Sequence, residues 1–460
     1  MRRPTWTRLA VAGAVLAVVA AGYLALRREG RPAAEGPAER LAPSTPPGAE
    51  PAPPAAGNSQ GFLYGRITTV DGATLEGRLR WGGGEEAFWD DVFNGTKKEN
   101  PWLAKLPPAE RPIESDPLEI FGVVVARRER PSEVKRPFVA PFGAIARIEA
   151  RGGEVRVTLK GGSAVALDRF EASDFDDELR VWDARGRATD LDSLRIRQID
   201  LLATPAIGGL ACRLSGVVHT AVGEFRGFVA WNRDAALGSD ELSGRSGGER
   251  LRLRLGDLRA LARSGREGLL VTLRDGRELP FEASSGSDGR RGLTVSDVRY
   301  GRVRVAWEVF ERVELEAPAG PAGCASGPAY DEIAPQPPLH GTVTARDGTL
   351  LAGRLVYDLD ESTEADTLDA GAEGIEYALP FGKVAAIVLP PAGESGEGRA
   401  GVVLRDGSEI RLDRTGDLAA ANAGLLVFVE GSDSPIYLPW AKAARLDFEP
   451  PAGDPGPEVR

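Results

Sequence analysis

The feature of this 460-residue chain that most limits its fold is a pattern that occurs three times. Each copy opens at a glycine, has a second glycine seven residues later, and closes with an aromatic residue four residues after a third glycine. Around the turn apolar and polar residues alternate, which is typical of a β-hairpin with one buried face. The opening and closing residues are Gly65 and Trp81, Gly216 and Trp231, and Gly341 and Tyr357. The chain is therefore expected to fold as three related β units.

The remainder of each unit also recurs. An aromatic residue followed by glycine, as at Phe142 and Phe381, precedes two aliphatic residues and a second hairpin. Near the ends of units two and three, Trp307 and Trp440 each stand six residues before an aliphatic residue, whereas unit one has Ser193 at this place. We expect the two tryptophan rings to be buried and equivalent.

Each half-unit has the pattern of a hairpin, a strand, a short helical turn and a closing strand, and no stretch after residue 30 shows a long helical period. This pattern resembles the small five-stranded barrels of the Src-homology and Sm-like type, and the layout resembles that of uncharacterised exported bacterial repeat proteins. The resemblance implies an all-β fold of three tandem units, each a pair of small five-stranded barrel-like modules, after one N-terminal transmembrane helix. Barrels of this type serve as binding modules, and the fold alone assigns no ligand.

An uncharged apolar run extends from Leu9 to Leu26. At a rise of about 1.5 Å per residue it spans about 27 Å as a helix, which is close to the thickness of a bilayer core. We expect a single-pass anchor in a bacterial inner membrane, with the C-terminal bulk periplasmic or extracellular. A cleaved signal sequence is the alternative, because residues 20–22 are small.

Composition and the repeats together divide the chain into parts. These are a short tail (1–8), the anchor or signal sequence (9–26), a Pro/Ala-rich linker (27–60), unit one (61–203) with an insertion (96–139), unit two (212–316), a Pro/Gly-rich hinge (317–338), unit three (339–450) and a disordered tail (451–460). The insertion is long for a connection between strands, so we expect it to be a partner-binding or mobile element.

The charges and histidines exclude several functions. A net charge of −11 argues against nucleic acid as a partner, because binding to phosphates needs a basic face. The chain has two histidines, His219 and His340, and neither has the neighbours of a catalytic triad or a zinc site. We expect no catalytic residues, no cofactor and no metal, and thus no enzyme.

Aromatic and acidic residues cluster in unit one. Trp89, Asp90, Asp91 and Trp102 are the candidates for a ligand or partner surface, since an aromatic face beside carboxylates suits a sugar or a peptide. The alternative is that the neighbouring aromatic residues belong to the core and the two tryptophans are merely exposed.

One acidic position recurs nine residues after each closing aromatic residue, at Asp90, Asp240 and Asp366. An aspartate that caps a turn between strands explains this spacing. A weak calcium candidate is the competing interpretation, because acidic residues of unit three fall at the offsets of a calcium-binding loop. Its residues are Asp358, Asp360, Asp366 and Asp369.

The only cysteines, Cys212 and Cys324, bracket unit two. In a unit whose terminal strands lie side by side they would be neighbours, and an oxidising compartment would allow a disulfide between them. Two free thiols are the alternative, since Cys324 lies in the Pro/Gly-rich linker.

Taken together, these features predict a membrane-anchored binding or scaffold protein of the cell envelope, with a protein partner and no nucleic acid. A carbohydrate or peptidoglycan binder that uses the unit-one aromatic residues is the first alternative, and an enzyme of unknown type is the second.

Overall fold

The computed structural model describes most of the chain after the N-terminal segment. The described residues are 59–450 except 83, 112, 121–122, 132–135, 172–173, 208–211, 233–234, 267, 284–291, 318–326, 392–397 and 433. Over this range the protein is all-β, as expected, and each helical segment is a three-residue 3-10 turn. None of the helices among the described residues is long and apolar enough to cross a membrane. The predicted anchor, the linker before residue 59 and the C-terminal tail lie outside the described residues.

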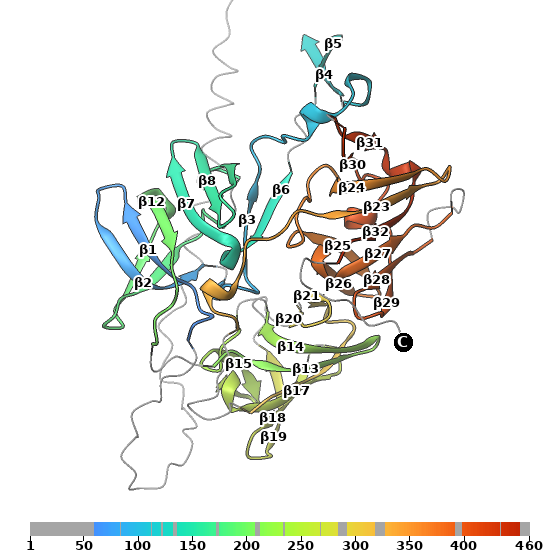
Figure 1. The fold of residues 1–460 in the computed structure, drawn as a ribbon. Coiled ribbons are helices and arrows are strands. Elements are labelled where there is room, and N and C mark those ends of the chain that lie inside the picture. The colour runs from blue at the N-terminus through green and yellow to red at the C-terminus, as the bar shows by residue number, and fades with distance from the viewer. Residues whose placement is uncertain are drawn as a thin grey trace, which may run out of the picture.

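Unit one forms an eight-stranded sheet and a small separate pair of strands (Figure 1). The order across the sheet is β11, β10, β2, β1, β12, β7, β8, β9, and the pair is β3 with β6. The strands are β1 (Tyr64–Thr69), β2 (Thr74–Trp81), β3 (Val92–Thr96), β6 (Pro137–Pro141), β7 (Ile145–Arg151), β8 (Glu154–Leu159), β9 (Ala164–Asp168), β10 (Leu179–Trp182), β11 (Ala188–Leu191) and β12 (Ile196–Leu201).

Units two and three repeat this strand order. The strands of unit two are β13 (Ser215–Thr220), β14 (Gly223–Trp231), β15 (Glu241–Ser246), β16 (Glu249–Arg254), β17 (Leu258–Ser264), β18 (Gly268–Leu273), β19 (Glu278–Ala283), β20 (Leu293–Asp297), β21 (Gly301–Val305) and β22 (Phe310–Leu315). Those of unit three are β23 (His340–Ala345), β24 (Leu350–Val356), β25 (Thr367–Ala372), β26 (Ile375–Pro380), β27 (Val384–Val388), β28 (Ala400–Leu404), β29 (Glu409–Leu412), β30 (Leu425–Phe428), β31 (Ile436–Leu438) and β32 (Ala443–Phe448). In all three units the last strand of the unit lies between the first strand and the fifth.

The pairing register confirms the equivalence of the three closing strands. Ile199, Val313 and Leu446 each pair with one residue of the first strand and one of the fifth. Counting back six residues places Ser193, Trp307 and Trp440 at one position. Both tryptophans are 5% exposed, so the prediction that they are buried and equivalent is confirmed.

Units two and three share one continuous sheet. The edge strand β21 of unit two pairs antiparallel with β26 of unit three, from Arg302 opposite Ala378 to Val305 opposite Ile375. Ile375 is also buried in the core of unit two. The two units are therefore joined by backbone hydrogen bonds and by a shared apolar contact, which the sequence did not indicate.

The segment predicted as a hinge is fixed to unit one along its described part, residues 327–338. Tyr330 is buried in the core of unit one, and its hydroxyl donates to the carbonyl of Ile145 at 2.8 Å. The ammonium of Lys160 donates to the carbonyls of Tyr330 and Ile333 and lies 3.5 Å from the centre of the Tyr330 ring. This part of the connection therefore does not act as a free hinge, because a large aromatic side chain anchors it.

The insertion of unit one extends to unit three. It contains two 3-10 turns, Leu103–Lys105 and Pro108–Glu110, and a two-stranded sheet of β4 (Ile113–Ile120) and β5 (Val123–Pro131) that lies beyond β31 in Figure 1. Leu106 is buried against Val356, Leu359 and Leu426 of unit three. The base of the insertion is thus packed against unit three.

Candidate functional site

Two of the four residues predicted to form a surface of unit one, Trp89 and Asp90, lie in the contact between units one and two. A carboxylate oxygen of Asp90 is 2.6 Å from the Arg213 guanidinium, and both side chains are 3% exposed. The Ser296 hydroxyl donates to the other oxygen of Asp90 at 3.1 Å, and the Trp89 ring meets Phe228 edge-on at 5.5 Å. Trp89 and Asp90 therefore bind unit two of the same chain.

Burial controls the electrostatics of this contact. It raises the pKa of Asp90 above its ordinary value, although the Arg213 guanidinium opposes the shift. It also raises the pKa of Glu86 to about 7, since the loss of water outweighs the attraction of Arg80, Arg213 and Arg78. The guanidinium of Arg78 lies 3.3 Å from the Glu86 carboxylate. One oxygen of Glu86 has no hydrogen-bond partner among the described residues. The contact therefore holds a buried carboxyl group, Glu86, whose pKa is about 7, beside Asp90, whose pKa is also raised.

The recurring turn aspartate of unit one is Asp91 rather than Asp90. The Asp91 carboxylate accepts the backbone N–H groups of Glu86 and Ala87, as the Asp366 carboxylate accepts those of Ser362 and Thr363. The prediction of a capped turn is confirmed, but the residue assigned to it in unit one was wrong. The loop after Trp81 is one residue longer than its counterparts, which frees Asp90 to pair with Arg213.

Trp102 lies elsewhere, on unit three. Its ring meets Phe428 edge-on at 6.1 Å, and the Arg354 guanidinium lies 5.6 Å from the Trp102 ring and 3.9 Å from the Phe428 ring. Trp102 and Trp89 therefore serve two different contacts between units. The four predicted residues are not brought together on one open face.

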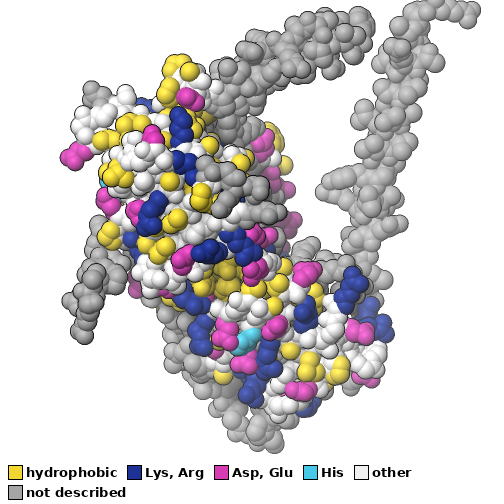
Figure 2. Space-filling view, turned by 90° about the vertical axis from the view of Figure 1, so that its right-hand side faces the viewer, with side chains coloured by type: hydrophobic (Ala, Val, Ile, Leu, Met, Phe, Trp, Pro, Cys, Tyr) yellow, Lys and Arg dark blue, Asp and Glu magenta, His cyan; other side chains and the backbone are white. Residues whose placement is uncertain are grey.

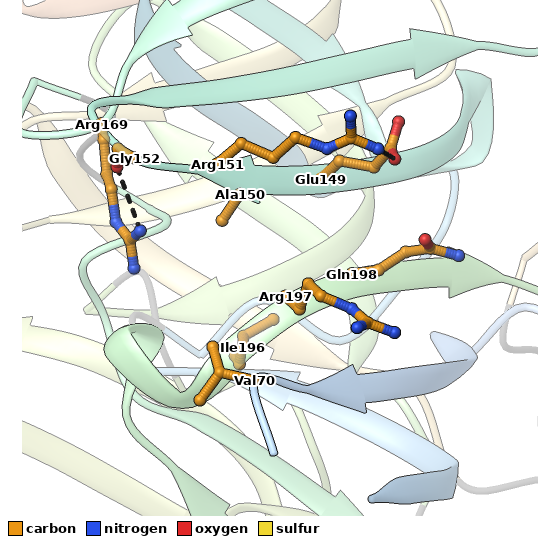
Figure 3. A pocket seen from close by; sticks show the side chains of 9 residues that line it. All are labelled: Val70, Glu149, Ala150, Arg151, Gly152, Arg169, Ile196, Arg197 and Gln198. Atoms are coloured by element: carbon orange, nitrogen blue, oxygen red, sulfur yellow. Dashed lines mark hydrogen bonds and ion pairs between the residues drawn. The ribbon is translucent and has the colours of Figure 1, made fainter. Parts of the chain in front are cut away.

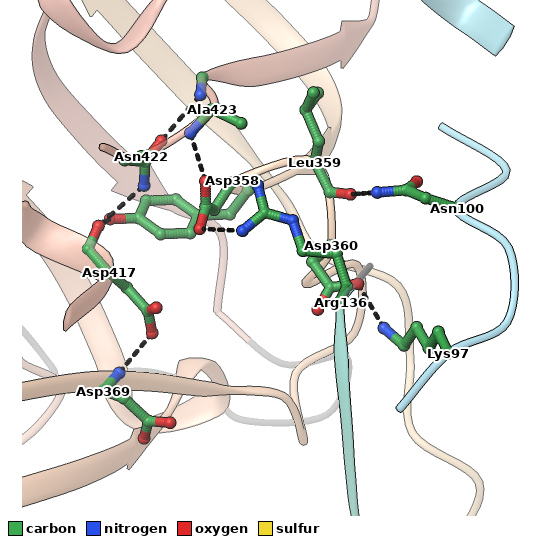
Figure 4. Close-up of polar contacts among 12 residues, drawn as sticks. Lys97, Asn100, Arg136, Asp358, Leu359, Asp360, Asp369, Asp417, Asn422 and Ala423 are labelled. Carbon is green, nitrogen blue, oxygen red and sulfur yellow. Dashed lines mark hydrogen bonds and ion pairs between the residues drawn. The ribbon is translucent and has the colours of Figure 1, made fainter. Parts of the chain in front are cut away.

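Two of the calcium candidates hold the base of the insertion (Figure 4). Both oxygens of Asp358 accept from Arg136 at 3.1 Å, and Asp360 pairs with the Lys97 ammonium. Asn100 adds a 3.0 Å hydrogen bond to the carbonyl of Leu359. Burial raises the pKa of both aspartates, against the opposing effect of their cationic partners.

The backbone at this turn is unusual. Asp358 and Leu359 have φ values of 47° and 53°, in the left-handed region that side-chain-bearing residues rarely adopt. The contacts of Asp358 with Arg136 and of Leu359 with Leu106 hold this conformation in place.

The calcium candidates do not converge. Asp366 caps its turn, and the N–H of Asp369 donates to the carboxylate of Asp417, whose pKa burial raises to about 7. The described residues contain no group of three or more potential ligands that could hold a metal ion. The chemistry of the cluster is ion pairing and capping.

Cys212 is disulfide-bonded. Its predicted partner, Cys324, lies outside the described residues, so the pairing of the two stays a prediction.

Unit one also has an open cleft at the end where β7 and β12 separate (Figure 3). Its volume is about 580 Å³, and the residues that line it include Arg151, Arg169 and Arg197 together with Val70 and Ile196. No motif in the sequence indicates this cleft, and its one signal is Ser193 in the place of a tryptophan. No protein-family model, curated protein or solved structure matches the chain.

Proposed function

We propose that this protein is a non-catalytic binding or scaffold protein that acts through protein–protein contacts at the bacterial cell envelope. In this proposal Leu9 to Leu26 anchor it in the inner membrane in a single pass, and the Pro/Ala-rich linker holds the folded part away from the bilayer on the periplasmic or extracellular side. The folded part is three tandem units, each a pair of five-stranded barrel-like modules of the Src-homology or Sm-like type.

The observation that carries the proposal is the locking of the three units to one another. Units two and three share a sheet through the pairing of β21 with β26. The Asp90–Arg213 ion pair joins units one and two, and the ion pair of Arg136 with Asp358 joins the unit-one insertion to unit three. Contacts of this kind hold surfaces at fixed distances and angles, which is what a scaffold supplies to its partners. On the face shown in Figure 2 basic and acidic side chains are interspersed, which suits specific protein contacts better than binding to a broad surface of one charge.

The test is co-purification from membranes of bacteria that express the tagged full-length chain, after mild crosslinking. We expect the chain to retain one or more envelope proteins in stoichiometric amounts. In parallel, purified chain is mixed with insoluble cell-wall polysaccharide. Retention on the polysaccharide, with no protein retained from membranes, would contradict the proposal and favour a carbohydrate binder.

A further inference from the structure

At the position equivalent to the cleft of unit one, units two and three each have side chains that bridge the neighbouring strands. In unit two, Trp307 donates from its indole nitrogen to the carbonyl of Arg266, at the turn between β17 and β18, at 2.9 Å. The Arg263 guanidinium donates to the carbonyls of Trp307 and Glu308, at 3.2 Å and 2.7 Å. These bonds bridge the closing strand β22 to the fifth strand β17.

Unit three closes the same place with a different arginine. Arg346, in the turn between β23 and β24, donates to the carbonyl of Ala441 at 3.0 Å and to that of Pro390 at 2.9 Å. Its guanidinium therefore bridges the segment before β32 and the end of β27.

Unit one lacks the tryptophan and the two arginines at these positions, and Arg169 instead bridges the turn after β7 and the segment before β12 through the carbonyls of Gly152 and Ser193. The common register places Ser193 at the position of Trp307, Ala150 at that of Arg263 and Val70 at that of Arg346. The backbone bond before each closing strand supports the last equivalence, since the N–H of Val70 donates to Arg195 as that of Arg346 donates to Lys442. The small side chains at these three positions leave room for a cleft beside Arg169.

The walls of the open cleft are basic. Glu149 is the only acidic residue beside the three arginines that line it, which gives the lining a net charge of +2. Arg197 is exposed and has no side-chain hydrogen bond or ion pair with the described residues, and the Arg151 side chain is 82% exposed with one bond to Glu149. Arg169 is held in place by the carbonyls of Gly152 and Ser193. Two exposed guanidinium groups thus stand beside one that is bound to backbone carbonyls.

The surroundings of the cleft are apolar as well as basic. Val70, which lines the cleft, is 61% exposed. Phe170 and Leu194, which lie close in sequence to the lining residues Arg169 and Ile196, are 78% and 67% exposed. These side chains offer apolar area beside the basic cleft for a partner to cover.

We propose that this cleft binds an acidic segment of a protein partner, with carboxylates on Arg151 and Arg197 and an apolar side chain against Val70 and Phe170. The proposal rests on the protein-binding function proposed above, and it names the chemistry of one partner segment. Arginine forks match carboxylates in a bidentate geometry, and the apolar rim adds burial that a free anion could not use.

A protein segment fits this place better than an anionic membrane does. The acidic residues Asp71, Glu171 and Asp192 are exposed around the cleft, in the turns and strand ends that frame it. A flat anionic surface would meet these three carboxylates together with the arginines, whereas a narrow chain that enters the cleft meets three arginines and one carboxylate, Glu149.

The experiment measures fluorescence anisotropy of a short fluorescein-labelled peptide of glutamate, leucine and serine with the full-length chain in detergent. Arg197→Glu and Arg151→Glu should each weaken binding by about tenfold, since each removes a charge-assisted contact and adds repulsion. Arg259→Glu, an exposed change of equal charge on unit two, should leave binding unchanged.

The decisive variant is Val70→Arg. It adds a positive charge, but its guanidinium would bridge the cleft as Arg346 bridges unit three, so it should weaken binding by about tenfold. Stronger binding in this variant, or no binding of the peptide to the unaltered chain, would overturn the proposal. Binding of phosphatidylglycerol vesicles that depends on Arg197, without binding of the peptide, would overturn it in favour of a membrane surface.

The same variants separate this inference from the proposed function. If Val70→Arg and Arg197→Glu still retain the envelope partner from membranes, the cleft assignment fails and the scaffold function stands. If no protein is retained by any form of the chain, the scaffold function itself fails. Equal denaturation midpoints for all variants would show that folding is unchanged.

Discussion

Replacing Arg213 with methionine tests whether units one and two are docked through a buried ion pair. The substitution removes the charge but keeps an unbranched chain beside Phe228, which the guanidinium now approaches to 5.3 Å. Asp90 would keep only the Ser296 hydroxyl as a partner, in a place where the carboxylate side chain is 3% exposed. Stranding a buried charge in this way costs about 3–5 kcal/mol of unfolding free energy.

A second substitution, Asp90→Asn, allows the interaction energy of the Asp90–Arg213 pair to be separated from the other effects of each substitution. In the double variant Arg213→Met with Asp90→Asn the Asp90 charge is gone, and Asp91, 3.9 Å from Arg213, keeps its two backbone N–H donors, so the loss should fall to about 1 kcal/mol or less. Chemical denaturation of the wild type, both single variants and the double variant gives the coupling energy. A loss under about 1 kcal/mol for Arg213→Met, with no recovery in the double variant, would refute the buried docking of units one and two.

Three further changes test other parts of the structure. Trp440→Ala should cost roughly 3–5 kcal/mol in chemical denaturation because the ring is a core side chain, and a loss under about 1 kcal/mol would mean that the ring is exposed. The folded-state pKa of Glu86, about 7, lies above its ordinary value, so stability should fall by roughly 2–3 kcal/mol as pH rises from 5 to 8, and Glu86→Gln should flatten that slope in denaturation series at several pH values. Deleting Lys98 to Arg136 should leave the cores of units two and three folded in scanning calorimetry, while uncovering Leu426; loss of cooperative unfolding in all three units would contradict this.

The parts of the fold that depend on local pattern could be predicted from the sequence. Alternating apolar and polar residues around Gly72 and Gly348 predict hairpins, and both glycines adopt the positive φ that such a turn needs. The six-residue spacing from Trp307 to Val313 and from Trp440 to Leu446 predicts the equivalence of the closing strands. Tyr330 was the exception, since a single aromatic residue in a Pro/Gly-rich stretch gives no periodic signal of burial.

The contacts between units could not be predicted. Pairing of β21 with β26 needs only free backbone groups at two sheet edges, which leave no side-chain signature. Nothing in the sequence around Arg213 or Arg136 indicates a partner, and only the fold brings them to Asp90 and Asp358. The cleft could be recognised only after the three units were aligned on their strand register, because it lies where unit one has smaller side chains than its counterparts.

The most direct test of the interlocked units is to cut the chain between units two and three. A protease site placed within residues 318–326 is cleaved in the purified chain under reducing conditions, and the product is measured by size-exclusion chromatography with light scattering. If β21 and β26 and the Asp358 contacts hold the units together, the cut chain should remain one species near 48.8 kDa. Separation into two smaller species would contradict the account.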